Sequence, residues 1–145
     1  MRPVFEWQIG SRGVQLGKRT LIMGVVNVTP DSFSDGGTNF DRERAVEYAL
    51  KLLQEGADII DVGGESTRPG AKVASATEPG VSEKEELDRV IPVISGVKQK
   101  NPLAIISVDT YKASVARAAV KAGAEIVNDV RGFLWDAQMW QTMAE

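Results

Sequence analysis

Five polar side chains follow four short apolar runs of the sequence, and residues of these types can bind a polar ligand. Asn27, Asp61 and Asp109 each follow or end such a run, and Asn128 with Asp129 ends a fourth. A buried strand gains nothing from a terminal carboxylate or amide unless a partner satisfies it. Any single one of these residues can be a cap or a brace, but a polar residue at every strand end favours a shared pocket.

Two long polar segments follow the first two of these runs. They span residues 27–37 and 63–81 and mix Gly, Pro and hydroxyl side chains. Most connections between a strand and a helix take about 2–6 residues, and much longer ones are usually functional or disordered. The composition suits a lid that orders on a substrate. Arg68 carries the fork of donors that fits phosphate oxygens, although by composition alone a surface arginine is the commoner explanation.

The composition restricts the chemistry and the partners. The 145 residues include no histidine and no cysteine, so imidazole, thiol and zinc–thiolate sites are excluded. The net charge of -3 argues against a strongly basic surface for nucleic acid. The apolar runs are too short to cross a bilayer, and the first residues lack the apolar core of a secretory signal. We therefore expect a cytoplasmic protein with neither a nucleic acid nor a membrane as its partner.

Alternating strands and helices are expected to position the polar residues. Apolar alternation around residues 10–13 predicts a β-hairpin, and the rest of the chain repeats a strand followed by a helix. Such repeats predict a parallel sheet covered by helices, with ligands at the carboxyl ends of the strands. The expected strands span residues 20–27, 58–62, 103–109 and 125–130. The expected helices span residues 41–55, 112–122 and 135–145, with another that begins at residue 82 and includes the apolar residues 87–94.

Three local features qualify these elements. Ser82 and Glu85 form a capping box for the second helix, and the acidic residues 83–86 predict a solvated first turn. Pro92 predicts a kink or break in that helix. The similar stretches 56–62 and 123–130 reflect either shared turn chemistry or an ancestral repeat.

Residues 21–37 (LIMGVVNVTPDSFSDGG) and 58–71 (DIIDVGGESTRPGA) resemble the two signatures of the dihydropteroate synthase family. Residues 107–110 and 127–130 resemble the third and fourth strand ends of that family. The resemblance covers the chain from about residue 14 to about residue 132. It implies the (βα)8 TIM-barrel fold, of which this α/β chain would hold the first four units after a hairpin. We expect residues 1–17 to form the hairpin and residues 18–145 the half-barrel of a single pterin-binding domain.

The resemblance also implies an activity. Members of this family join 6-hydroxymethyl-7,8-dihydropterin pyrophosphate to 4-aminobenzoate and release pyrophosphate. It implies catalytic roles for Asn27, Arg68 and Asp109, with Asn27 as the ligand of a Mg²⁺ cofactor. The substrate-binding residues that it implies are Thr67 and Arg68 at the pyrophosphate, Asp109 and Asn128 at the pterin ring, and Phe33 and Pro69 at the aminobenzoate.

The chain departs from the family in one large respect. The later βα units of the barrel are absent, and with them half of the residues that contact the substrates. We therefore expect this chain to be an N-terminal part of the barrel and to be inactive alone. The resemblance further implies a sulfonamide target and a homodimer for the intact enzyme, and exposed strand edges leave self-association of this chain as an alternative.

Two other functions remain open from the residues. A methyltetrahydrofolate methyltransferase is another pterin enzyme on the same barrel, although residues 29–33 and 66–70 suit an aminobenzoate and pyrophosphate site better. A non-catalytic, receiver-like α/β module fits the length of the chain and needs no further strands. That module would leave both long loops without a role.

Overall fold

The computed structural model describes residues 3–29, 38–65 and 80–145. A two-stranded antiparallel hairpin comes first, formed by β1 (Phe5–Ile9) and β2 (Arg12–Leu16). A four-stranded parallel sheet follows, in the order β3-β4-β5-β6. Its strands are β3 (Met23–Asn27), β4 (Ile59–Gly63), β5 (Ile105–Asp109) and β6 (Ile126–Asn128), and its helices are α1 (Thr38–Gln54), α2 (Glu83–Lys100), α3 (Ala113–Ala122) and α4 (Met139–Ala144).

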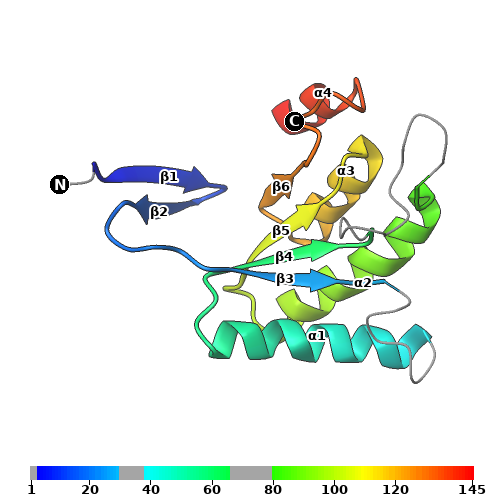
Figure 1. Cartoon of the computed structure of the whole chain (residues 1–145), viewed down its shortest axis with the longest axis horizontal. Coiled ribbons are helices and arrows are strands. Elements are labelled where there is room, and N and C mark those ends of the chain that lie inside the picture. Colours follow the sequence, from blue (N-terminus) through cyan, green and yellow to red (C-terminus); the bar gives the residue numbers. More distant parts are fainter. Residues whose placement is uncertain (1–2, 30–37, 66–79) are drawn as a thin grey trace.

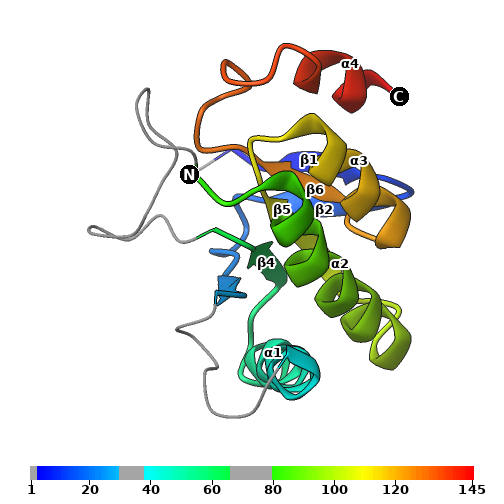
Figure 2. The ribbon, with the colours of Figure 1, turned by 90° about the vertical axis from the view of Figure 1, so that its right-hand side faces the viewer.

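The long helices α1, α2 and α3 lie on one side of the sheet (Figure 1, Figure 2). Each strand adds next to its predecessor, so the chain winds in one direction across the sheet. A doubly wound domain of receiver type instead reverses its strand order and carries helices on both faces. The receiver-like alternative is therefore wrong, and the prediction of four βα units after a hairpin is confirmed.

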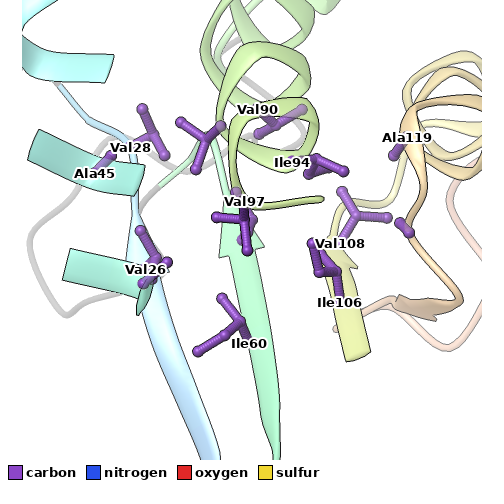
Figure 3. Packing of buried hydrophobic residues seen from close by; sticks show 14 of the residues in the cluster. Val26, Val28, Ala45, Ile60, Val90, Ile94, Val97, Ile106, Val108 and Ala119 are labelled. Carbon is purple, nitrogen blue, oxygen red and sulfur yellow. The ribbon is translucent and has the colours of Figure 1, made fainter. Parts of the chain in front are cut away.

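The core lies between the sheet and the helices (Figure 3). Val26 of β3 lies beside Ala45 of α1, and Ile60 and Ile106 lie on the same side of the sheet with Ile94 and Val97 of α2. All of these side chains are buried. Side chains alternate across a strand, so the residues between them face the other way. That opposite face is referred to below as the inner face. It exposes 40% of Met23 and 52% of Val25.

Helix α2 runs through Pro92 without the expected break. A proline in a helix leaves the carbonyl four residues earlier without its N–H donor. Here that carbonyl belongs to Asp88, and it accepts a hydrogen bond of 3.2 Å from Arg42 Nη2 of α1 instead. A tertiary contact thus satisfies the carbonyl that the proline leaves without a donor. The predicted capping box is confirmed, with Ser82 and Glu85 bonded reciprocally.

The last helix is shorter than predicted. Residues 129–138 form turns, because Asp129 Oδ1 and Oδ2 accept bonds from the backbone N–H groups of Arg131 and Phe133. Asp136 then accepts from the N–H of Ala113 and so caps α3 from a distant part of the chain. Met139 of α4 is buried, while Trp140 is 62% exposed. No helix in the described ranges is both long enough and apolar enough to span a membrane.

Candidate functional site

A line of polar side chains crosses the sheet at the carboxyl ends of its strands. Asn27 of β3 pairs with Gly63 of β4, Gly63 pairs with Asp109 of β5, and Asp109 pairs with Asn128 of β6. Residues in register across a parallel sheet share a face, and this face is the inner one. Asn27, Gly63, Asp109 and Asn128 are called the polar row below.

Gly63 leaves a gap in the middle of the polar row. A β-carbon at this position would lie 3.6 Å from Asp109 Oδ2 and 3.7 Å from Asn27 Oδ1. The side chains of Asn27 and Asp109 therefore approach the same point from the two strands on either side of β4. The sequence prediction that Asn27, Asp109 and Asn128 converge agrees with this geometry.

A second line of polar groups lies two residues earlier on the same strands. Asp61 pairs with Ser107, and both are buried on the inner face. Asn128 Nδ2 donates to Asp61 Oδ2 over 3.1 Å, which joins the two lines. Asp61 Oδ1 and Ser107 Oγ have no hydrogen-bond partner among the described residues. A buried polar atom without a partner is costly, so these atoms suit the donors of a bound ligand.

The sequence placed Asp61 at a strand end of the expected pocket without giving it a role, and it did not indicate Ser107. Asp61 was identified as a strand-end residue, but its place on the inner face depends on the strand register. The signal that could have found both is the period of two along a strand, because Asp61 and Ser107 each precede a polar-row residue by two positions.

The carboxyl group of Asp109 lies in a strongly acidic environment. Burial raises its pKa most, and the charges of Asp61, Glu86, Asp129 and Glu65 raise it further, to about 6. Asp109 is therefore largely ionised at pH 7 but takes up a proton just below that pH. Perturbed acids of this kind concentrate at binding and catalytic sites.

The burial of Glu86 differs from what the sequence predicts. The acidic stretch 83–86 was predicted to be solvated, and Glu83 and Glu85 are exposed, but Glu86 is 1% exposed and pairs with Lys112. It lies on the face of α2 that packs against Gly64, where a β-carbon would come within 2.9 Å of Glu86 Cγ. The sequence missed this contact because the partner is 26 residues away.

Four of the predicted site residues cannot be placed in this way. Phe33, Thr67, Arg68 and Pro69 lie outside the described residues. The predicted pyrophosphate and aminobenzoate contacts therefore stay predictions.

A hollow of about 570 Å³ lies at the opposite end of the sheet. It separates the hairpin from the amino ends of β4 and β5 and contains none of the predicted site residues. Ligands of parallel α/β folds bind at the carboxyl ends of strands, so we assign the site to the polar row. The hollow is lined by Gly13, Val14, Gln15, Lys18, Arg19, Leu21, Asp58, Ile59 and Ile105.

The winding of the sheet and the polar row on its inner face define a ligand-binding α/β chain with the architecture of half a barrel. Residues 23–145 match the family model described as "Pterin binding enzyme". The chain belongs to the pterin-binding enzyme family.

The relatives carry the name dihydropteroate synthase. The chain is 48% identical over 138 residues to the dihydropteroate synthase of Clostridium beijerinckii, covering 95% of this chain and 48% of the relative. It is 52% identical to that of Bacillus subtilis, covering 88% and 42%. The chain thus spans about half the length of the curated relatives it matches. These names favour the synthase over the methyltransferase alternative.

Solved structures agree with the fold. A dihydropteroate synthase of Xanthomonas albilineans with 4-aminobenzoic acid superposes with a TM-score of 0.82 at 46% identity, covering 96% of this chain and 48% of that one. A complex of an enzyme from the same organism with 7,8-dihydropteroate gives 0.78 at 42%, covering 96% and 47%. The Yersinia pestis enzyme with a sulfonamide drug gives 0.77 at 40%, covering 95% and 48%.

Proposed function

We propose that this chain supplies the pterin-binding part of a dihydropteroate synthase. The reaction would join 6-hydroxymethyl-7,8-dihydropterin pyrophosphate to 4-aminobenzoate. The amine nitrogen forms a bond to the pterin methylene carbon, the bond from that carbon to the diphosphate oxygen breaks, and its electron pair leaves with the diphosphate. The proton of the resulting ammonium passes to solvent. The observation that carries the proposal is the polar row, with Asp61 and Ser107 beside it on the inner face.

The polar row fits the edge of a pterin ring. The carboxylate of Asp109 accepts hydrogen bonds from ring N–H and amino groups, and the carboxamide of Asn128 can accept as well as donate. Asn128 already donates to Asp61, which fixes the orientation of its amide and leaves its Oδ1 available as an acceptor. A fixed pattern of buried acceptors and donors discriminates strongly against ligands that lack the matching groups.

Asn27 is the residue proposed to hold Mg²⁺. Its Oδ1 lies beside the gap at Gly63, and Mg²⁺ takes oxygen ligands, with few from the protein and the others from water and substrate phosphates. The described residues contain no group of three or more carboxylates that would form a cage of their own. An amide oxygen at the edge of the site therefore fits an ion that is held mainly by the diphosphate. Bound there, the ion would neutralise charge on the departing diphosphate.

The 66–79 and 30–37 segments are proposed to complete the site. Thr67 and Arg68 would contact the diphosphate, and Phe33 and Pro69 would contact the aminobenzoate. Sulfonamide sensitivity, a homodimer of the intact enzyme and a cytoplasmic location belong to the same proposal. Each rests on the family resemblance and on the named relatives.

Titration of the chain with the pterin pyrophosphate and Mg²⁺ tests the proposal. We expect saturable binding that Asp109→Ala and Asn128→Ala each weaken by about 10-fold or more, because a lost hydrogen bond to a buried polar group costs about 1–3 kcal/mol. Lys121→Met, on the exposed end of α3, serves as the matched control and should bind like the unchanged chain. Absence of saturable binding by the unchanged chain would contradict the proposal.

Turnover is a separate measurement. We expect the isolated chain to bind the pterin substrate without forming dihydropteroate, because the inner face beside the site exposes Met23 and Val25 and leaves the pocket open to water. A steady-state assay that finds turnover close to that of a complete relative would show that the chain is active alone.

A further inference from the structure

A buried ion cluster lies directly behind the polar row. Lys112 Nζ pairs with Glu86 and lies 3.4 Å from Glu65 Oε2. Tyr111 donates its hydroxyl proton to the same Glu65 oxygen over 2.9 Å. Glu65 and Glu86 are 6% and 1% exposed. Glu65, Glu86, Tyr111 and Lys112 are called the Lys112 cluster below.

The cluster contains one cation and two carboxylates. Burial alone would lower the pKa of Lys112, but its hydrogen bond and ion pair with Glu86 outweigh this and raise that pKa. Lys112 therefore stays protonated. Buried carboxylates need such a partner, and removal of the partner leaves an uncompensated charge.

The cluster holds the end of β4 against α2. Glu65 lies two residues after Gly63 of the polar row, and Glu86 Cγ lies so close to Gly64 that a β-carbon there would approach it to 2.9 Å. One turn further along α2, Arg89 Nη1 donates to the carbonyl oxygen of Gly64 over 2.8 Å. The first turns of α2 thus fix Gly64 from one side, and Lys112 fixes Glu65 from the other.

The same cluster is connected to β5 and β6. Lys112 lies three residues after Asp109, and its backbone N–H donates to Thr110 Oγ1 over 3.2 Å. The N–H of Thr110 donates in turn to the carbonyl oxygen of Asn128 over 3.0 Å. The side chain of Lys112 thus contacts Glu65 after β4 and Glu86 of α2, while its backbone is bonded into the turn that joins the ends of β5 and β6.

We propose that Lys112 is a positioning residue for pterin binding, which acts through Glu65 and Glu86 by locking the end of β4 to α2 and by neutralising the two carboxylates nearest to it. This inference rests on the function proposed above. Lys112 itself is not expected to touch the ligand.

The charge of Lys112 predicts an effect on the pH dependence of binding, which a purely structural role would not produce. Four carboxylates act on Asp109. They are Asp61 of β4, Glu65 two residues after that strand, Glu86 of α2 and Asp129 after β6. Among the residues that the structure describes, Lys112 pairs with two of these four carboxylates, Glu65 and Glu86. Without it, Asp109 should take up a proton at a higher pH and lose its function as an acceptor for ring N–H groups.

The experiment measures the affinity of the chain for the pterin pyrophosphate with Mg²⁺ from pH 5.5 to pH 8.5. We expect Lys112→Met to weaken binding about 10-fold at pH 8 and to move the loss of binding at acid pH to higher pH. Lys112→Arg keeps the charge and should retain most of the affinity. Lys121→Met carries the same substitution on an exposed site of α3 and should change neither quantity.

A double variant separates the effect of the charge of Lys112 on Asp109 from its effect on the link between the end of β4 and α2. It also keeps the proposal testable if Lys112→Met does not fold. Lys112→Met with Glu86→Gln removes one positive and one negative charge together, so the field at Asp109 is nearly restored, while the link that Lys112 makes between Glu65 and Glu86 is lost. We expect the affinity at pH 8 to stay weak and the acid limb to return to its original pH. If Lys112→Met does not fold, this double variant and Lys112→Arg decide the question.

The outcomes are distinguishable. A folded Lys112→Met chain with unchanged affinity and an unchanged pH profile overturns the positioning role and leaves the proposed function intact. An equal loss of affinity in Lys112→Arg and Lys112→Met also overturns it, because charge and pairing would then not matter. No pterin binding by the unchanged chain overturns both proposals.

Discussion

At the scale of single residues, Asp109 shows how strongly position changes chemistry. An isolated aspartate titrates near pH 4, yet burial and four neighbouring carboxylates raise the pKa of Asp109 to about 6. The acidic field that raises this pKa also keeps Asp109 a good acceptor once it is ionised. The polar row is therefore electrostatically unfavourable without a ligand, as binding sites often are.

The raised pKa predicts that Asp109 destabilises the fold at neutral pH. Because the native carboxyl holds its proton to a higher pH than the unfolded one, the contribution of Asp109 to the free energy of unfolding falls as pH rises from about 4 to about 6. Asp109→Asn removes this dependence. We expect the variant to be more stable than the unchanged chain by about 1–2 kcal/mol at pH 7, less than the full shift implies because the group is partly exposed.

Urea unfolding of both chains from pH 4 to pH 8 measures this difference. The gain in stability should shrink as pH falls and be small at pH 4, where Asp109 is protonated in the native chain and about half protonated in the unfolded chain. A gain that stays the same at every pH would show that the substitution acts through packing rather than charge.

At the scale of elements, helices α1 and α2 pack at a contact that only glycine allows. Gly96 of α2 faces the buried Val46 of α1, and a β-carbon at position 96 would lie 2.7 Å from Val46 Cγ2. The same pair of helices is joined at Pro92, where Arg42 satisfies the carbonyl oxygen of Asp88. Two residues that lower helix propensity are thus tolerated because of the neighbouring helix.

Gly96→Ala should destabilise the chain although alanine is the better helix former. Helix propensity favours alanine by about 1 kcal/mol, but the stiff, buried side chain of Val46 cannot move away, and overpacking costs about 1–3 kcal/mol. We expect a lower free energy of unfolding in urea. In the double variant Val46→Ala with Gly96→Ala the loss should be clearly smaller than the sum of the two single losses, and additive losses would contradict the predicted contact.

At the scale of the whole molecule, the chain has one covered face and one open face. Helices cover the outer face of the sheet (Figure 2). The inner face carries the polar row and the exposed side chains of Met23 and Val25. The hairpin lies beyond the amino ends of the strands (Figure 1). Arg12 of β2 joins it to the sheet, because its guanidinium donates to Glu125 Oε1 and to the carbonyl oxygen of Leu103.

Arg12→Met should release the hairpin and leave the remaining fold intact. The residues of β1 are mostly exposed, so few other contacts hold the hairpin, and weakly held segments open locally. We expect faster amide hydrogen exchange in residues 5–16 and unchanged protection in β4 and β5. Equal protection of the hairpin in both chains would show that Arg12 does not hold it.

The order of elements and the polar strand ends were predictable from the sequence, because hydrophobic periodicity and glycine stops are local signals. Asn27, Asp109 and Asn128 were identified in this way, and the strand register brings them into one row. The last helix was predicted too long because Asp136 accepts hydrogen bonds from the backbone N–H groups of Gln138 and Ala113, which compete with helix formation at its expected start. Of the kink or break predicted at Pro92, the break does not occur, because α2 continues through Pro92 and Arg42, far away in the sequence, satisfies the freed carbonyl oxygen of Asp88.

The sequence by itself determined the four βα units, the signatures of the family and the residue types of the polar row. Only the tertiary structure decided which acids are buried together, because burial and charge depend on neighbours that are distant in the chain. The sequence predicts that Glu86 lies in a solvated helical turn, whereas the tertiary structure buries it in an ion pair with Lys112. The properties that matter for binding, such as the raised pKa of Asp109, therefore arise from the tertiary structure.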